Sequence, residues 1–571
     1  MVYCLANNVI SPLGETTEVN YQAIKSGQSA LSRYEGLWHV PEPFTAALFS
    51  EEQKQALAID GLTWFESLAV SSILKANEKS HIDITASNVI FILGSTKGNI
   101  ELLKDGEQTP TEYYLGETAK RITDAVGITT QPIVACNACI SGVSAIILAM
   151  RLLDSGYYDY AVVCGADVQN KFTMSGFQSL KAVSQEPCRP FDLERLGLNL
   201  GEAAATLILG SDRIVKTSNN WCVERGAVRN DAFHVSSPSK NGEGARLALC
   251  STHADTITGQ LAFINAHGTA TMFNDQMESV AIERSGLNMV PVNALKGYYG
   301  HTMGAAGVLE TAISMCAVQD KTILGTRGFS DRGVSGKILL SADNQPTAKD
   351  SFVKMISGFG GSNAALLVSK TPKLEPSHHE KPEYVKTHHV SLSPGQLIID
   401  GTRQALPSDE KDWLTAIYKQ HVSSYPKFYK MDMLSRLAFV ATEVLLQAEG
   451  KERFVDSDDR AVLMFNHSSS IQADRSYLAT IADDESCFPS PSVFVYTLPN
   501  MAVAEVAMRN LYHGETSLYI LPERDDNTMQ QVVLASLLDE STRSMITGWL
   551  DYEDKDHFEA DISIIQTLNN Q

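Results

Sequence analysis

The sequence predicts an α/β fold, and its length, its composition and the order of its apolar segments support that prediction. With 571 residues, the chain is too long for one ordinary core, so we expect two or more units. A content of 44% hydrophobic and 20% charged residues is typical of a globular protein. Through residue 370, apolar runs of strand length alternate with helical segments, the order that favours layered helices and sheets.

Strands are predicted at apolar runs between residues 88 and 343. Four runs have strand length: NVIFILGST (88–96), DYAVVCGAD (159–167), AATLILG (204–210) and GKILLSAD (336–343). A polar stretch with three prolines, TPKLEPSHHEKPEYVKTHH (371–389), interrupts this order and is predicted to be a linker. It contains two histidine pairs, which we interpret as solvated polar residues, with a metal site as the alternative: His378, His379, His388 and His389.

A second α/β segment is predicted from about residue 390 to residue 571. It has a helix over 431–450 and a strand over 461–469, followed by VFVYTLPNMAVAEVAMRNLYHGE (493–515), which begins with a strand-like run.

The net charge of −21 argues against nucleic acid or an anionic membrane as the partner, because both require a large basic surface. No apolar run reaches the roughly 18 to 20 residues of a membrane span, and the start MVYCLANNVISPLG lacks the basic segment of a signal peptide. We therefore expect a cytoplasmic protein. Nine cysteines without the spacing of metal ligands or of a disulfide framework are compatible with reduced thiols.

Two cysteines lie close together in VACNACISGVSAIILAMRLLDSG (134–156), where a strand-like segment passes into a helix-like one. Cys139 is at the junction, where free backbone N–H groups and the helix dipole favour a thiolate. Cys136 lies within the strand and lacks this stabilisation. The position therefore favours Cys139 as a nucleophile and Cys136 as a packing residue.

Three later segments have the composition of turns that present polar groups. INAHGTATMFND (264–275) places His267 at a strand end, and NALKGYYGHTMGAAG (293–307) contains Lys296 and His301. SGFGGSNAALLVS (357–369) is a glycine-rich turn whose N–H groups can bind a ligand oxygen. Together with Cys139, these residues predict one catalytic site.

The segments NACISG, HGTATMFND, KGYYGHTMGAAG and GFGGSNAAL resemble, in this order, the four signature motifs of the β-ketoacyl-(acyl carrier protein) synthases, condensing enzymes with the thiolase fold. VISPLG near the start and residues 175–210 match as well, so the resemblance covers 1–370. GSTKGN, NACISG and LGLNLGEAAAT are similar to an aryl polyene and flexirubin-type subgroup.

The resemblance implies a thiolase-like five-layer αβαβα fold followed by a C-terminal α/β segment. We expect a ketosynthase N-terminal half with the nucleophile over 1–210 and a C-terminal half over 211–370. A linker over 371–395 and a C-terminal α/β domain over 396–571 complete the expected order.

The resemblance also assigns roles to site residues. Cys139 would take the acyl group from a carrier-protein thioester, and His267 and His301 would assist decarboxylation of a malonyl thioester. Backbone N–H groups of Cys139 and Phe359 would form the oxyanion hole. Lys296 would keep the histidine region in order by pairing with a carboxylate, either Glu310 or Glu278, a choice that stays open at this stage.

Further residues receive supporting roles from the same resemblance. Phe359 with Gly360 would form a gate beside the nucleophile, and Thr269, Thr271 and Ile140 would contact the substrate. For Asp192, Arg195 and Glu202 a structural ion-pair role is expected.

The chain departs from the family pattern near the acyl site. Met355, Ile356 and Ser357 stand where Asn-Ser-Phe usually precedes GFGG, and Asn137 replaces a common Ser or Thr. These changes leave the acyl chain length open.

The function implied is the condensation of an acyl thioester with malonyl carrier protein in fatty acid, polyketide or aryl polyene biosynthesis. No metal or redox cofactor is expected, since the substrates are carried on the phosphopantetheine of an acyl carrier protein. A homodimer or a ketosynthase-like heterodimer is expected. The alternatives are a non-catalytic chain-length factor, which typically lacks the cysteine, and a thiolase-type acyltransferase, which would not carry these histidine motifs.

The last 180 residues suggest a repeat. AMRNL (507–511) aligns with AMRLL (149–153), which places Thr497 at the position of Cys139. We hypothesise that about 400–525 form a degenerate thiolase-like half without a nucleophile, with a structural or carrier-docking role. The alternative is that any strand–turn–helix–strand unit aligns this well. The hypothesis requires strands at 461–469 and 493–497 that are parallel neighbours.

Overall fold

The computed structural model describes residues 1–215, 220–374, 382–406, 412–482 and 488–568, and its first sheet contains the strands predicted from the apolar runs. The order in this sheet is β5-β4-β6-β8-β1. Its strands are β1 (Val2–Ile10), β4 (Val89–Gly94), β5 (Ile133–Ala135), β6 (Tyr160–Asp167) and β8 (Ala203–Ser211). β4 is parallel to both β5 and β6, whereas β8 is antiparallel to both β6 and β1.

A second sheet repeats this arrangement. Its order is β11-β10-β15-β16-β9, again with two parallel pairs followed by two antiparallel pairs. The strands are β9 (Trp221–Asn230), β10 (Leu261–Asn265), β11 (Pro291–Asn293), β15 (Ser351–Gly358) and β16 (Ser362–Ser369). The strand predicted over 336–343 is reduced to β13 (Leu339–Leu340), which pairs with β11.

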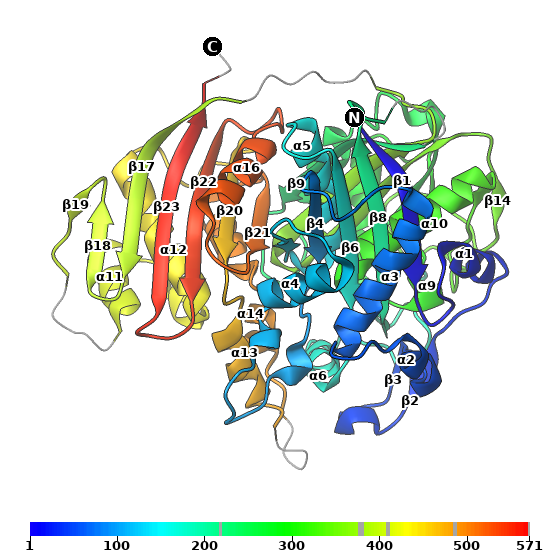
Figure 1. Cartoon of the computed structure of the whole chain (residues 1–571), viewed down its shortest axis with the longest axis horizontal. Helices are drawn as coiled ribbons and strands as arrows, with labels where there is room; N and C mark the ends of the chain where they lie inside the picture. Colours follow the sequence, from blue (N-terminus) through cyan, green and yellow to red (C-terminus); the bar gives the residue numbers. More distant parts are fainter. Residues whose placement is uncertain (216–219, 375–381, 407–411, 483–487, 569–571) are drawn as a thin grey trace.

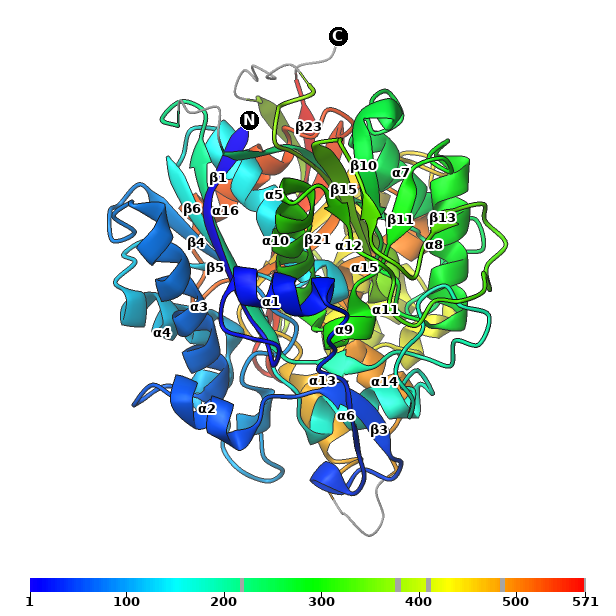
Figure 2. The same ribbon diagram turned by 90° about the vertical axis from the view of Figure 1, so that its right-hand side faces the viewer.

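Helices form three layers around the two sheets, as Figure 2 shows. α5 (Ser141–Asp154) and α10 (Ala306–Gln319) lie between the sheets and are buried on nearly all sides. Small residues allow this close packing, since a Cβ at Gly142 would lie 2.5 Å from the Gly304 carbonyl oxygen. The outer layers contain α3 (Trp64–Ser80), α4 (Leu115–Val126), α7 (Glu243–Ser251) and α8 (Met272–Arg284). The predicted five-layer thiolase-like fold is thereby confirmed.

Shorter elements connect these layers. They are α1 (Thr17–Lys25), β2 (Ser32–Tyr34), β3 (Phe44–Ala47), α2 (Glu51–Leu57), α6 (Lys171–Ser179), β7 (Leu200–Gly201), α9 (Lys296–Tyr299), β12 (Thr322–Ile323) and β14 (Gln345–Pro346). Among the described residues, no helix combines the length and the apolar character needed to cross a bilayer.

The C-terminal unit, residues 384–567, contains the same strand order a third time. The order β21-β20-β22-β23-β17 again has two parallel pairs followed by two antiparallel pairs. The strands are β17 (Tyr384–Ser393), β20 (Arg460–Asn466), β21 (Thr516–Ile520), β22 (Ser544–Tyr552) and β23 (Phe558–Thr567). β18 (Gln396–Ile399) and β19 (Thr402–Arg403) extend its outer edge.

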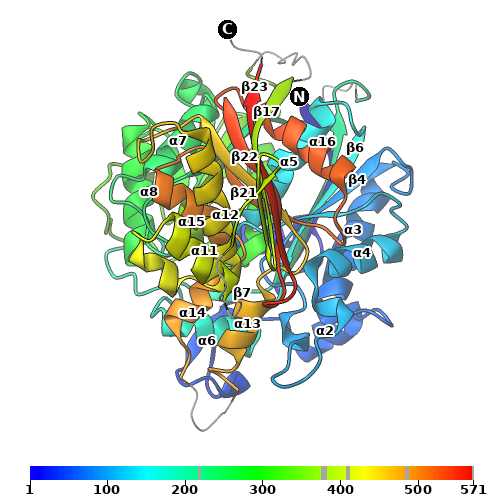
Figure 3. The same ribbon diagram turned by 90° about the vertical axis from the view of Figure 1, so that its left-hand side faces the viewer.

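Figure 3 shows how helices cover this third sheet. α11 (Trp413–His421), α12 (Met433–Glu449) and α15 (Met501–Asn510) lie on one face, and α16 (Asp526–Ser536) lies on the other face near α5. α12 begins at an Asp432 side chain that accepts from the N–H groups of its first turn, and it ends at Gly450 in the left-handed conformation. The predicted helix over 431–450 and strand over 461–469 are confirmed.

The C-terminal unit continues the first sheet without a break (Figure 1). β21 pairs antiparallel with β5, with Tyr519 opposite Ala135 and Ile520 opposite Val134. Buried ion pairs cross the same boundary: Arg151 lies 2.5 Å from Glu515 and 3.1 Å from Asp539, which also accepts from Arg229 at 2.7 Å. The unit is therefore joined to the body by main-chain bonds and by desolvated charges.

The strand predicted over 493–497 is wrong, because this stretch lies in helix α14 (Pro491–Tyr496) and its cap. Pro491 begins the helix, where its fixed φ suits the first turn, and burial of Phe494 outweighs the β propensity of VFVY. The alignment that placed Thr497 on Cys139 is wrong for the same reason. The parallel neighbours of β20 are β21 and β22, so residues 493–497 are not a neighbouring strand and the repeated half-fold has a different register from the one predicted.

The predicted linker over 371–395 is too long, because its later part forms β17. Pairing with β23 supplies the main-chain partners that the polar sequence did not reveal. His388 and His389 belong to this strand and contact Asp400 and Asp561, whereas His378 and His379 lie outside the described residues.

Candidate active site

A strained turn positions Cys139, the predicted nucleophile, between β5 and α5. Ala138 has φ 49°, in the left-handed region that residues with a Cβ rarely adopt. The Ser141 hydroxyl donates to the Ala138 carbonyl oxygen (2.6 Å) and accepts from the Asn137 N–H (2.9 Å). These bonds hold Cys139 at the start of the helix, as predicted. Cys136 lies fully buried directly after β5, with its sulfur 3.7 Å from the Thr96 carbonyl oxygen.

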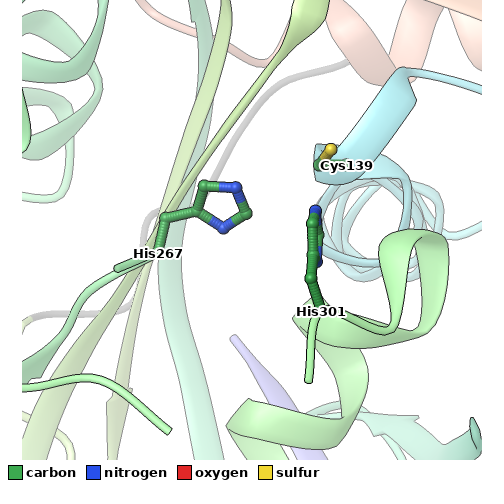
Figure 4. Close-up of side chains that lie close together, drawn as sticks. All are labelled: Cys139, His267 and His301. Atoms are coloured by element: carbon green, nitrogen blue, oxygen red, sulfur yellow. The ribbon is translucent and has the colours of Figure 1, made fainter. Parts of the chain in front are cut away.

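The structure brings Cys139, His267 and His301 together (Figure 4). Their sulfur and ring nitrogen atoms lie within 4.8 Å of one another, and the two imidazole rings are nearly perpendicular, with centroids 4.9 Å apart. His267 follows the end of β10 and His301 follows α9. His267 Nδ1 and His301 Nε2 are buried without a hydrogen-bond partner among the described residues, so both atoms are available to a substrate.

Burial determines the protonation state of this trio. It raises the pKa of the Cys139 thiol to about 12, although nearby Lys296 acts in the opposite direction. Burial therefore keeps the thiol protonated in the free protein, contrary to the expectation that the helix start favours a thiolate. Burial, reinforced by Lys296, holds the pKa of His267 and of His301 well below the ordinary value. Both imidazoles are neutral at pH 7, and each has one N–H donor and one acceptor.

Two backbone N–H groups point to the sulfur from opposite segments. Hydrogen bonds from the N–H groups of Cys139 and Phe359 act to lower the pKa of the Cys139 thiol, less strongly than burial raises it. The Phe359 N–H reaches this place because the turn between β15 and β16 has Gly360 at φ 82° and Gly361 at φ 69°. Such a pair of donors is the geometry of an oxyanion hole, as the resemblance implied.

Lys296 pairs with Glu310 at 2.8 Å, which settles the alternative that the sequence left open. Its ammonium also donates to the His267 carbonyl oxygen at 2.6 Å. Glu278 instead accepts from the N–H groups of His267 (2.7 Å) and Gly268 (2.8 Å). Burial and, secondly, Asp275 raise the pKa of Glu278 to about 7. Both carboxylates thus fix the loop that contains His267.

Lys354 belongs to the same cluster, and the sequence analysis missed it. Its fully buried ammonium binds the second carboxylate oxygen of Glu310 and lies 3.4 Å from the Ala266 carbonyl oxygen. Burial lowers the pKa of Lys354 to about 8, opposed by Glu310. A lysine inside the apolar strand SFVKMISG was the signal that could have revealed it.

Asp167 is a second residue of this region that the sequence did not lead us to predict. Its carboxylate accepts from the Ser95 hydroxyl (2.9 Å) and from the Gly304 N–H (2.6 Å), and burial raises its pKa to about 6. It ties the end of β4 to the turn after His301.

Two cavities meet at Cys139. The outer cavity has a volume of about 330 Å³, and its lining includes Cys139, His267, Thr269, Thr271, His301, Met272, Phe273 and Phe359. The inner cavity has only about 10 Å³ and is lined by Thr96, Lys97, Ala138, Cys139, Thr173, Phe177, Met303, Phe359, Phe494 and Leu498. Phe359 lines both cavities and packs against Phe177, a position that suits the predicted gate.

Other predicted residues lie outside these linings. Ile140 is fully buried in the apolar core. The Asp192 carboxylate accepts from the N–H groups of Ser330 (2.7 Å) and Asp331 (3.0 Å), and Arg195 donates to carbonyl oxygens, including that of Asp192 (2.8 Å).

An ion-pair role was expected for Asp192, Arg195 and Glu202, and Asp192 lies 3.4 Å from Arg189. Glu202 accepts from the N–H groups of Phe49 and Gln169.

Comparisons with known proteins agree with this site. The model of the β-ketoacyl synthase N-terminal domain matches residues 7–213, and that of the β-ketoacyl synthase C-terminal domain matches residues 222–330. Together they cover more than half of the chain, which belongs to the β-ketoacyl synthase family. 3-oxoacyl-[acyl-carrier-protein] synthase 2 of Vibrio cholerae is 26% identical over 408 residues, which cover 63% of this chain and 97% of that protein. Nodulation protein E of Rhizobium meliloti is 24% identical over 384 residues, covering 62% and 95%.

Solved structures share the fold. The ketosynthase of Xenorhabdus doucetiae, solved in complex with its chain length factor, aligns with a TM-score of 0.54 at 24% identity, covering 64% of this chain and 97% of that one. A ketosynthase–chain length factor protein, PfaC, aligns over 99% of this chain and 78% of that one, with a TM-score of 0.76 at 15% identity. The second alignment includes the C-terminal unit.

Proposed function

We propose that this chain catalyses the decarboxylative condensation of an acyl group held on Cys139 with a malonyl thioester of an acyl carrier protein. The observation that carries the proposal is the buried arrangement of one thiol, two neutral imidazoles within 4.8 Å and two convergent backbone N–H groups. A chain-length factor would need neither the thiol nor the histidine pair, so the active enzyme is favoured over that alternative.

The first half-reaction is acyl transfer. The Cys139 thiol gives its proton to a neutral imidazole of the trio, and its sulfur attacks the thioester carbonyl carbon. The oxyanion of the tetrahedral intermediate accepts hydrogen bonds from the N–H groups of Cys139 and Phe359. The carrier thiolate leaves and takes the proton back from the imidazolium, so the acyl enzyme forms with both histidines neutral.

The second half-reaction forms the carbon–carbon bond. The malonyl carboxylate leaves as carbon dioxide, and the electron pair of the broken bond forms an enolate whose oxygen accepts hydrogen bonds from His267 and His301. The enolate carbon attacks the acyl carbonyl carbon on Cys139, and the thiolate leaves and takes up one proton from solvent, so one proton is consumed for each carbon dioxide released. Neutral imidazoles suit this step because each has an N–H to donate.

The partner proposed for both steps is an acyl carrier protein, in line with the names of the relatives. The aryl polyene subgroup, the cytoplasmic location and the lack of a metal or redox cofactor stay predictions. The resemblance implied a homodimer or heterodimer, and in this chain β21 pairs with β5 and leaves that edge closed to a second copy. We propose that a single chain replaces such a dimer.

The test uses acetyl-loaded acyl carrier protein and intact-protein mass spectrometry. Wild type and Cys136→Ala are expected to gain an acetyl group, and Cys139→Ala is expected to gain none. His267→Asn and His301→Asn are expected to keep the acetyl adduct but to lose carbon dioxide release from malonyl carrier protein. An adduct that persists in Cys139→Ala would overturn the assignment.

A further inference from the structure

Asn137 departs from the family pattern at a place where the C-terminal unit meets the catalytic turn. The residue lies between Cys136 and Ala138, just after the end of β5, and it is fully buried. β21 pairs with β5 along this edge, and Figure 1 shows the continuous sheet that results. A substitution at this junction therefore affects both the turn that holds Cys139 and the contact between the two parts of the chain.

Three polar atoms of Asn137 have three different partners. Its side-chain oxygen accepts from the Leu518 N–H of β21 (2.8 Å), and its main-chain N–H donates to the Ser141 hydroxyl (2.9 Å). Its carbonyl oxygen accepts from the Ile140 N–H (3.2 Å). One residue thus joins the start of α5, the turn before it and a strand of the C-terminal unit.

Leu518 binds the same segment a second time. Its carbonyl oxygen accepts from the Cys136 N–H (3.1 Å), so β21 holds the chain directly before Asn137 and also through the Asn137 side chain. The hydroxyl of the Ser or Thr that is common at this position lies closer to its own main chain than an asparagine oxygen does. With such a residue, the buried Leu518 N–H would lose this partner, which is unfavourable.

The amide nitrogen of Asn137 indicates that the side chain does more than fill space. Its Nδ2 is buried without a hydrogen-bond partner among the residues that the structure describes. A buried N–H donor that makes no bond destabilises a protein, and a smaller side chain would avoid that penalty. The asparagine is present despite this penalty, so we look to its oxygen, which has a partner, for its role.

The turn after Asn137 is strained, and two contacts hold it. Ala138 has φ 49°, a conformation that persists only where the surroundings enforce it. The Ser141 hydroxyl holds the turn from α5 through the Ala138 carbonyl oxygen, and the bond between Asn137 and Leu518 holds it from β21. Without the second contact the turn can relax toward an ordinary φ, which changes the direction of the Cys139 N–H.

We propose that Asn137 is a positioning residue that directs the Cys139 N–H toward the oxyanion through its hydrogen bond to Leu518. This inference rests on the proposed function. The second donor is held separately, because Asn500 donates to the Phe359 carbonyl oxygen (3.1 Å). Loss of the contact between Asn137 and Leu518 is therefore expected to weaken one donor of the pair.

The experiment compares two reactions of Cys139 in the full chain, each followed by mass spectrometry. Acetyl transfer from acyl carrier protein passes through an oxyanion, whereas alkylation by iodoacetamide displaces iodide and forms none. Asn137→Ala and Asn137→Thr are each expected to slow acetyl transfer by about tenfold, less than the roughly 10²–10³-fold loss typical of a donor removed outright. Alkylation is expected to stay within about threefold of wild type, as is the carrier concentration that gives half the maximal rate.

The control is Tyr158→Phe. The Tyr158 hydroxyl donates to Gln531 of α16 (3.1 Å), so this variant removes a hydrogen bond between the body and the C-terminal unit beyond the far end of α5. It is expected to leave both reactions unchanged.

Thermal melting identifies a variant that fails to fold, in which case the other Asn137 variant decides. The proposal is overturned if the folded variants transfer acetyl at the wild-type rate, or if both reactions of Cys139 slow equally. Failure of both Asn137 variants to fold would also overturn it, because the contact would then serve folding. Wild type that gains no acetyl group would instead contradict the proposed function.

Discussion

Replacement of Lys354 by methionine tests whether the second buried lysine serves the chemistry or only the packing. Glu310 has one lysine on each carboxylate oxygen, so Lys354→Met leaves the carboxylate paired with Lys296. Loss of one partner of a buried ion pair typically lowers the free energy of unfolding by about 3–5 kcal/mol. Because Lys296 still pairs with Glu310, we expect Lys354→Met to lower it by about 3 kcal/mol or less.

The expected effect on the reaction follows from charge. Removal of a donor that touches an oxyanion typically lowers the rate by about 10²–10³. Lys354 does not touch the substrate and acts only through its charge near the histidines. We therefore expect Lys354→Met to lower the rate of decarboxylation at pH 7 by about tenfold. The rate of Cys139 acetylation is expected to change by less than about threefold, since the oxyanion-hole donors stay in place. Lys349→Met, at an exposed position, is the matched control.

The pH profile separates this role from a structural one. Burial lowers the pKa of Lys354 to about 8, so its charge is present below that pH and is lost above it. Charged groups face it from three helices: Glu310 on α10, Lys296 on α9 and Glu278 on α8; His267 and His301 complete the surroundings.

Wild-type carbon dioxide release is therefore expected to fall above about pH 8, and Lys354→Met is expected to lack this alkaline decline. Lys354 also contributes to the lowered pKa of both histidines, so the acid limb of the variant is expected to move to higher pH. A variant whose pH profile and rate match wild type would refute the reasoning.

Three further predictions concern assembly and stability. Light scattering is expected to give a monomer of about 62.3 kDa, because β21 covers the β5 edge; a stable dimer that forms through β5 would contradict this. Asp539→Asn is expected to destabilise the protein by about 3 kcal/mol in denaturant, because it leaves Arg151 and Arg229 short of a buried partner. Burial opposes ionisation of Asp539, but those arginines hold its pKa well below the ordinary value. Its contribution to stability is therefore present at neutral pH and is lost as the pH falls through the folded-state pKa. Asp539→Asn should not show this pH dependence of stability. Gly360→Ala is expected to slow acetylation of Cys139, since φ 82° is unfavourable for alanine and the added Cβ would lie 2.9 Å from Met501; acetylation at the wild-type rate would contradict this.

Much of the body could be read from the sequence because its signals are local. β4, β6 and β8 are continuous apolar runs, which is the pattern of strands buried on both faces. Cys139, His267, Lys296 and His301 each lie in a turn with a distinctive composition, so their types and neighbours sufficed to find them.

The tertiary structure decided what depends on long-range contacts. Lys296 pairs with Glu310 and not with Glu278 because α10 packs beside Lys296. The protonation state of the Cys139 thiol depends on desolvation, which its position at a helix start does not reveal. VFVY became a helix because Phe494 is buried against Phe177 and Tyr477, and β17 became a strand because β23 supplies its partners.

The sequence by itself thus determined the family, the five layers and the choice of Cys139, His267 and His301, which the structure brings together, since these follow from local pattern and from motifs. Only the tertiary structure showed that residues 384–567 complete the first sheet and close the cavity behind Cys139. The physical reason is that strand pairing and cavity volume are properties of surfaces brought together from distant parts of the chain, which residue periodicity does not encode.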